Sequence, residues 1–154
     1  MLALVALLCQ LTPQARPTVP PSVLVTRYRD ADEVYLYGQG TPDGRMFEYA
    51  VPKAQFDKSP RWAVEKDPPP LAISRALEVA KKAAQAEHPE FTELLVSTIS
   101  LHQVGSHSGQ KRWFYDIAMY PITNGEASYD SQVTVIVLMD GVVVKPRERS
   151  KAAR

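Results

Sequence analysis

Residues 71–87 carry the clearest periodic pattern of the chain, because apolar positions recur there every three or four residues. The apolar stripe consists of Ile73, Ala76, Leu77, Ala80, Ala83 and Ala84. Three prolines, Pro68 to Pro70, precede the pattern, and Pro89 ends it at or before His88. The pattern predicts one amphipathic helix, and its small alanine side chains allow it to lie close to a sheet.

Alternation of apolar and polar residues predicts strands on both sides of this helix. The predicted strands are residues 23–29, 34–37 and 45–51 before the helix, and 94–104, 112–120 and 132–139 after it. Asp140-Gly141 then forms a hairpin turn into residues 142–144. Residues 132–139 become apolar on both sides, which is typical of the centre of a sheet. The predicted fold class is α+β, with one main helix packed on an antiparallel β-sheet meander and extra N-terminal β-strands.

The helix and one face of the sheet are expected to share a single hydrophobic core. This core should contain Leu77, Ile99, Trp113, Tyr115, Ile117 and Val135. The proline-rich segment 52–70 should cross the surface as an irregular connection, held in place by Trp62 in its middle.

The N-terminal residues 1–11 form an uncharged, mostly apolar run. This run is too short to span a bilayer, but it has the length of the apolar region of a signal peptide. We therefore expect a signal peptide at residues 1–15, a Pro-rich linker at 16–22, a single α+β domain at 23–145 and a basic flexible tail at 146–154. The chain would then be exported, either to the periplasm or out of the cell.

Cys9 is the only cysteine of the chain. Removal of residues 1–15 would leave no cysteine, so no disulfide could form within the chain. The alternative is a lipoprotein in which Cys9 carries the lipid. Leu8 disfavours this alternative, because a lipidation signal places a small residue just before the cysteine.

Composition excludes several classes of function. The 154 residues are 45% apolar and 23% charged, which indicates one globular domain. The 18 basic and 17 acidic residues nearly balance, so the net charge gives no general attraction to nucleic acid. The chain contains no phosphate-binding glycine motif, and its three histidines lack the spacing of metal ligands. We expect no cofactor, no metal, no nucleic-acid partner and no membrane span, and the oligomeric state stays open.

His102 and Asp116 are the residues closest to a catalytic arrangement. If Leu101 pairs with Ile117, the same register sets His102 opposite Asp116. The alternation of each strand places both residues on its polar side, where we expect them to face solvent. A surface histidine beside a surface carboxylate is the simpler interpretation, and we therefore assign no catalytic residue.

Aromatic residues gather in the predicted N-terminal strands. Tyr35 and Tyr37 should share one face, and so should Phe47 and Tyr49. On an exposed sheet they would form a flat binding platform, and in a buried sheet they would form part of the core. These four residues, together with His102 and Asp116, are the candidate binding surface.

Three segments carry a resemblance to a known family. They are the helix Ile73–Ala80, the aromatic strand Trp113–Ile117 and the Val-rich hairpin Met139–Val144. The stretch that contains them, about residues 70–144, resembles the PepSY domain. The resemblance implies a PepSY/cystatin-like helix on an antiparallel sheet, a place outside the cytoplasm and a role in restraining peptidases. It implies no catalytic residues.

Three hypotheses for function follow. The leading one is a non-enzymatic exported domain that binds a protein or peptide partner in the cell envelope, at the edge of its sheet. The alternative is a small-ligand-binding domain with a pocket between helix and sheet. The weakest is a hydrolase around His102 and Asp116.

Overall fold

A computed structural model describes residues 32–41, 44–104, 111–123 and 125–149. Its elements are β1 (Glu33–Gly40), β2 (Met46–Pro52), α1 (Lys53–Phe56), α2 (Ile73–Glu87), β3 (Glu93–Val104), β4 (Arg112–Thr123), β5 (Glu126–Ala127), β6 (Val133–Leu138), β7 (Val143–Val144) and β8 (Pro146–Glu148). The predicted signal peptide at 1–15, the linker at 16–22 and the strand at 23–29 lie outside the described residues. The predicted helix is α2, and β1, β2, β3, β4 and β6 are the other predicted strands.

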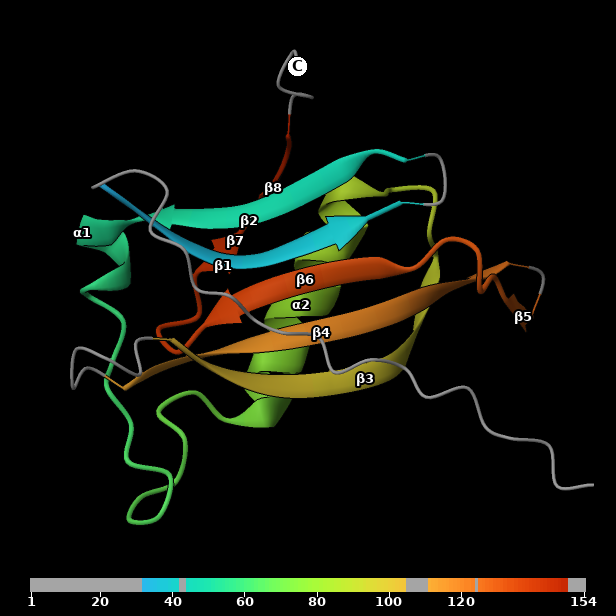
Figure 1. Cartoon of the computed structure of the whole chain (residues 1–154). Helices are drawn as coiled ribbons and strands as arrows, with labels where there is room; N and C mark the ends of the chain where they lie inside the picture. The colour runs from blue at the N-terminus through green and yellow to red at the C-terminus, as the bar shows by residue number, and fades with distance from the viewer. Residues whose placement is uncertain (1–31, 42–43, 105–110, 124, 150–154) are drawn as a thin grey trace, which may run out of the picture.

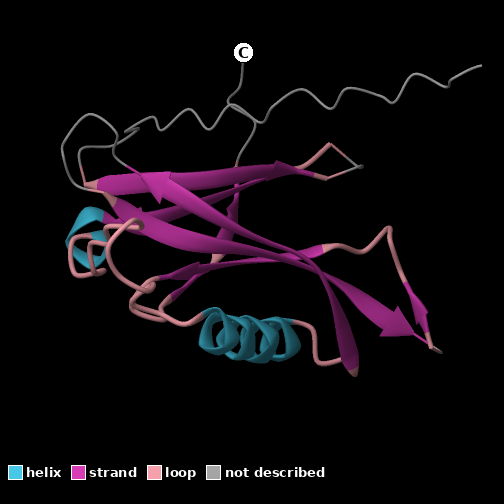
Figure 2. Cartoon of the chain, turned by 90° about the horizontal axis from the view of Figure 1, so that it is seen from below, coloured by secondary structure: helices cyan, strands magenta, loops and turns pink. Residues whose placement is uncertain are grey.

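The strands form two antiparallel sheets, and not one meander with extra strands at its start. The larger sheet has the order β3-β4-β6-β7, with β5 paired to β4, and the smaller sheet has the order β1-β2-β8. Figures 1 and 2 show three layers, with α2 on one face of the larger sheet and the smaller sheet on the other. The α+β class is confirmed, and most of the elements are strands with a single main helix.

The first core lies between α2 and the larger sheet. Ala76, Ala80 and Ala84 of α2 are fully buried, and the helix packs mainly on β6 and also on β4 and β7. Small side chains at these positions allow the helix backbone to approach the sheet closely. The alanine stripe that the sequence predicted is therefore the face that packs.

The predicted core is confirmed in part. Tyr115, Ile117 and Val135 are buried in it. Leu77 and Trp113 are only partly buried against it. Ile99 was expected in the core but is 37% exposed, because it lies on β3, beyond the strands that α2 covers.

A second core lies between the two sheets. It contains Val34, Leu36, Tyr49, Val51, Phe56, Val104, Phe114, Ile136, Leu138 and Val144. All six residues of β6 are buried because this strand has a packed layer on each side. The prediction that 132–139 lie at the centre of the sheet is confirmed, since β6 pairs with β4 on one side and β7 on the other.

The expectation of a flexible tail at 146–154 is wrong for its first residues, and residues 150–154 lie outside the described residues. Pro146–Glu148 form β8, which pairs with β2. Arg147 donates two hydrogen bonds to Glu33 and one to Glu48, at 2.7–2.9 Å. These bonds from the Arg147 guanidinium lower the pKa of Glu33 below its usual value. Two carboxylates on neighbouring strands thus hold the first residues of the basic segment in the sheet.

Arg112 connects the segment after α1 to the larger sheet. Its side chain is buried beside the Phe56 ring and donates to the carbonyl oxygens of Ser59 and Asp57, at 3.0 and 2.6 Å. Residues 57–59 are thereby fixed at the start of β4. The chain continues from there into the loop at residues 61–67.

Candidate functional site

Strand β3 is an edge of the larger sheet (Figure 1). Within the described residues it pairs with β4 alone, so the backbone along its other side has no partner strand there. Its residues 94–104 include no Asp, Glu, Lys or Arg. Natural edge strands are usually short or protected by charges or prolines. Here the protection within the strand is a bulge between Val96 and Thr98.

Two apolar side chains of β3 are exposed on the face of the larger sheet that carries α2. Ile99 and Leu101 pair with Ile117 and Tyr115, whose side chains lie in the core under α2. Side chains of paired residues point to the same face of a sheet. Ile99 and Leu101 therefore extend the apolar face of the sheet outward, and they are 37% and 36% exposed.

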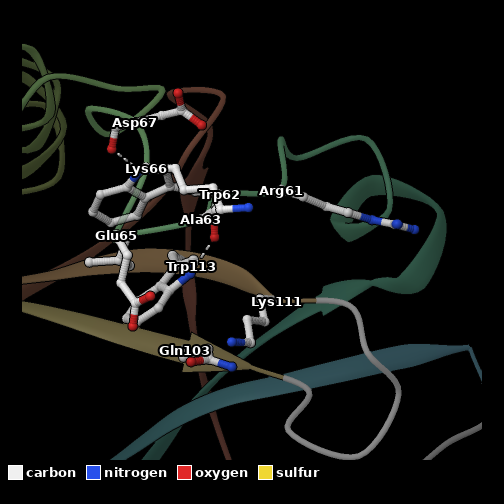
Figure 3. Close-up of a pocket in the computed structure, with 10 residues that line it drawn as sticks. Arg61, Trp62, Ala63, Glu65, Lys66, Asp67, Gln103, Lys111 and Trp113 are labelled. Atoms are coloured by element: carbon white, nitrogen blue, oxygen red, sulfur yellow. Dashed lines mark hydrogen bonds between the residues drawn. The ribbon is translucent and has the colours of Figure 1, made fainter.

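A hollow of about 690 Å³ lies at the end of the same strand. Its lining includes Trp62, Trp113 and Gln103, and Gln103 follows Leu101 on the same face of β3. Figure 3 shows the Trp62 and Trp113 rings beside each other, with Lys111 and Gln103 on the strand side. The exposed strip of β3 thus runs toward the hollow.

The two tryptophans fix the shape of this hollow. Their ring centroids are 5.5 Å apart in an edge-to-face arrangement. The Trp62 Nε1–H donates to the Asp67 carbonyl oxygen at 2.7 Å, and the Trp113 Nε1–H donates to the Trp62 carbonyl oxygen at 3.2 Å. The prediction that Trp62 holds the irregular segment in place is confirmed. Because both indole donors are occupied, the rings can offer a ligand mainly their apolar surfaces.

The structure brings His102 and Asp116 together in a different register from the expected one. Leu101 pairs with Tyr115, so His102 lies opposite Phe114 and Asp116 lies opposite Ser100. A shift of two residues keeps both side chains on one face, and they meet diagonally. His102 Nε2 and Asp116 Oδ2 are 3.5 Å apart.

The expectation that this pair faces solvent is wrong. The His102 and Asp116 side chains are 22% and 14% exposed, because the smaller sheet packs over that face. The imidazole stacks on the Phe114 ring, with centroids 5.2 Å apart. Neither residue lines the hollow at Trp62. Their position between two packed sheets favours a structural role.

The four predicted aromatic residues do not share one exposed face. A bulge in β1 makes Tyr35 pair with Ala50 and Tyr37 pair with Tyr49, so the two tyrosines of β1 point to opposite faces. Tyr49 is buried between the sheets and Tyr37 packs beside it, while Phe47 is half-buried. Leu36, at the bulge, is buried in the same core as Val34, and the bulge brings Tyr37 to that core as well.

The hydroxyls of Tyr37 and Tyr49 lie in an environment that favours their neutral form. Burial, and secondarily the negative charge of Asp116, raises the pKa of both groups above the usual tyrosine value. The Tyr49 hydroxyl donates to the Thr134 carbonyl oxygen at 3.0 Å. This bond joins the smaller sheet to β6 of the larger one.

Two classes of feature are absent from the described part of the chain. It contains no group of three or more histidine, cysteine, aspartate or glutamate residues that could hold a metal ion. None of its helices is long and apolar enough to cross a membrane.

Comparison with known proteins adds no relative. No family model, no curated protein and no solved structure matches the chain. The resemblance to the PepSY domain therefore stays a prediction from the sequence. The exposed edge of β3 and the adjoining Trp62–Trp113 hollow are the features from which a function can be argued.

Proposed function

We propose that the chain is a non-enzymatic binding domain that takes up an extended segment of a protein along the edge of β3. The observation that carries this proposal is a 12-residue edge strand with an uncharged stretch, 94–104, and an exposed apolar side. Main-chain hydrogen bonds would supply affinity, as in other domains that bind by strand addition. Side chains of the added strand would cover Ile99 and Leu101.

The hollow beside Gln103 would add selectivity to this mode of binding. Strand addition gains specificity from pockets that accept alternate side chains of the bound segment. The Trp62 and Trp113 rings offer such a pocket at one end of β3, where a bulky apolar side chain could pack. Backbone pairing along β3 and one anchored side chain would then act together.

The exported location and a peptidase-restraining role extend the same proposal. The apolar run at residues 1–11 supports export, and the PepSY resemblance supports a partner among extracytoplasmic peptidases. Fractionation of the native host tests the location: an intact N-terminus on a protein in the cytoplasm would contradict it.

Binding of a small ligand is the second candidate, supported by the hollow itself. A volume of about 690 Å³ is within the usual range of ligand sites. Its place differs from the expected one, since it lies between the 61–67 loop and the β3–β4 end and not under α2. The hypothesis of a hydrolase at His102 and Asp116 remains the weakest of the three.

Selection from a displayed library of random 10- to 12-residue peptides tests the leading proposal. Selected peptides should lack proline, should alternate β-branched or aromatic residues, and should quench or shift tryptophan fluorescence. The chain contains two tryptophans, Trp62 and Trp113, so this signal comes from the hollow. The double variant Ile99→Lys/Leu101→Lys should lose peptide binding at least tenfold, because it places two charges on the contact side.

Val142→Lys is the matched control for these variants. Val142 has the same exposure as Ile99, 37%, but it lies at the turn before β7, which is at the opposite edge of the larger sheet from β3. Val142→Lys should bind the selected peptides as the unmodified chain does. Peptide binding by Ile99→Lys/Leu101→Lys that equals binding by the unmodified chain would contradict the proposal. Fluorescence changes with small molecules alone would favour the second candidate.

A further inference from the structure

The two ends of β3 differ in charge. Exposed Glu90 and Glu93 lie at its start. At its other end the hollow is lined by three cations, Arg61, Lys66 and Lys111, and by the carboxylates of Glu65 and Asp67. The edge therefore runs from an acidic end, across the uncharged stretch 94–104, to an end with an excess of positive charge.

An identical strand fits this edge in one direction only. If two copies of β3 pair antiparallel about a two-fold axis, the acidic end of each copy meets the basic end of the other. Parallel pairing would set Glu93 against its own counterpart and Lys111 against its own, with repulsion at both ends. The uncharged centre of β3 is compatible with both arrangements. The charges at its two ends therefore favour the antiparallel one.

Apolar side chains on β3 also match an identical partner. Eight large apolar side chains are exposed in the described part of the chain, and three of them, Leu95, Ile99 and Leu101, lie on this strand. An antiparallel partner would cover Ile99 and Leu101 with the same pair from the other copy. Such an isologous contact closes on itself and leaves the outer edge of β3 paired in both copies.

We infer that the strand added to β3 is β3 of a second copy, in an antiparallel two-fold dimer with one sheet continuous across both copies. This inference rests on the proposed function, because it names the partner of the same edge. A foreign strand would need an uncharged stretch of similar length and matching charges at both ends. The β3 strand itself supplies all of these features.

Sedimentation equilibrium of the purified chain tests the inference through charge reversal. Glu90→Lys/Glu93→Lys should weaken the dimer about tenfold, and Lys66→Glu/Lys111→Glu should do the same. Combining all four changes should restore the dimer to within about threefold, because opposite charges then meet again. Within one copy the two ends are separated by the 12 residues of β3, about 35 Å, so this restoration cannot arise inside a copy.

The outcomes separate this inference from the proposal on which it rests. A dimer that Ile99→Lys dissociates, Val142→Lys leaves intact and the fourfold reversal restores would support both. A monomer that still binds selected peptides through Ile99 and Leu101 would keep the proposed function and overturn the second-copy inference. A monomer that binds no peptide, with the edge covered by another part of the same chain, would overturn both. A dimer unaffected by charge reversal would place its interface elsewhere.

Discussion

Two histidine–carboxylate pairs of this chain differ mainly in their surroundings. His88 Nδ1 lies 3.3 Å from Glu90 Oε1 at the end of α2, where the two side chains are 40% and 61% exposed. His102 and Asp116 lie between two sheets and are 22% and 14% exposed. Each imidazole also stacks on a phenylalanine ring. Both pairs thus join a histidine to a carboxylate, and they differ in how strongly solvent screens the interaction between the two groups.

We expect His102→Ala to lower the free energy of unfolding by about 1–3 kcal/mol, because it removes a ring that packs on Phe114 between the two sheets and leaves a cavity beside Asp116. His88→Ala should cost about 0–1 kcal/mol, as exposed pairs usually do. Urea unfolding of both variants measures the difference. Equal small losses would restore the surface interpretation that the sequence suggested.

The strand pattern predicted the side of each residue correctly, but it did not predict what covers that side. Period two placed His102 and Asp116 on one face, and a register shift of two left them there. The face looked solvent-exposed because Thr98, Ser100 and His102 are polar. The signal against exposure was β6, whose apolar residues on both sides require a second packed layer.

At the level of elements, α2 shows what periodicity can establish. Its stripe predicted both the helix and the packing face, and Ala76, Ala80 and Ala84 are fully buried. The same fully buried alanines form the contact with β6, where we expect a larger side chain to displace packed neighbours. Close packing also limits the chance of a ligand pocket between helix and sheet, where the second hypothesis had expected one.

Ala80→Leu should therefore lower the free energy of unfolding by about 1–3 kcal/mol or more, although leucine is a good helix former, because it overfills the contact with the sheet. Ala86→Leu is the matched control, since Ala86 lies on the exposed side of the same helix and should change stability by about 0.5 kcal/mol or less. Thermal unfolding compares the two. A neutral Ala80→Leu would mean that α2 packs loosely enough to admit a ligand.

Two irregularities within strands could not be predicted from alternation. The bulge in β1 moves Tyr35 and Tyr37 to opposite faces, and β3 has a bulge between Val96 and Thr98. A bulge adds one residue and reverses the facing of all that follow. Neither segment carries a local sequence signal for its bulge, so alternation alone placed Tyr35 and Tyr37 on the same face.

At the scale of the whole molecule, the second sheet determines which residues are available for function. It covers one face of the larger sheet, while α2 covers much of the other, and no strand among the described residues pairs with the outer side of β3. Its own assembly depends on long-range contacts that a local pattern cannot specify, such as the bonds of Arg147 in β8 to Glu33 and Glu48. For the same reason the sequence did not predict that residues 146–148 of the expected tail form β8.

The contact between the sheets should weaken in alkaline solution, and Tyr49 should account for part of this effect. Burial raises the pKa of the Tyr49 hydroxyl above its ordinary value of 10.0, so the folded state holds this proton more tightly than the unfolded state. Stability from this group is fully present below pH 10.0 and falls as the pH rises toward the folded-state value. Tyr49→Phe cannot ionise, so it should lose less stability between about pH 9 and 11 than the unmodified chain, although it lacks the bond to Thr134 at neutral pH. Urea unfolding at several pH values measures both effects.

Tyr120→Phe is the control, because the Tyr120 hydroxyl bonds to Gln132 in an exposed position. This variant should leave the decrease in stability with rising alkaline pH unchanged. Identical slopes for Tyr49→Phe and the unmodified chain would show that the Tyr49 hydroxyl does not hold its proton across the sheet interface.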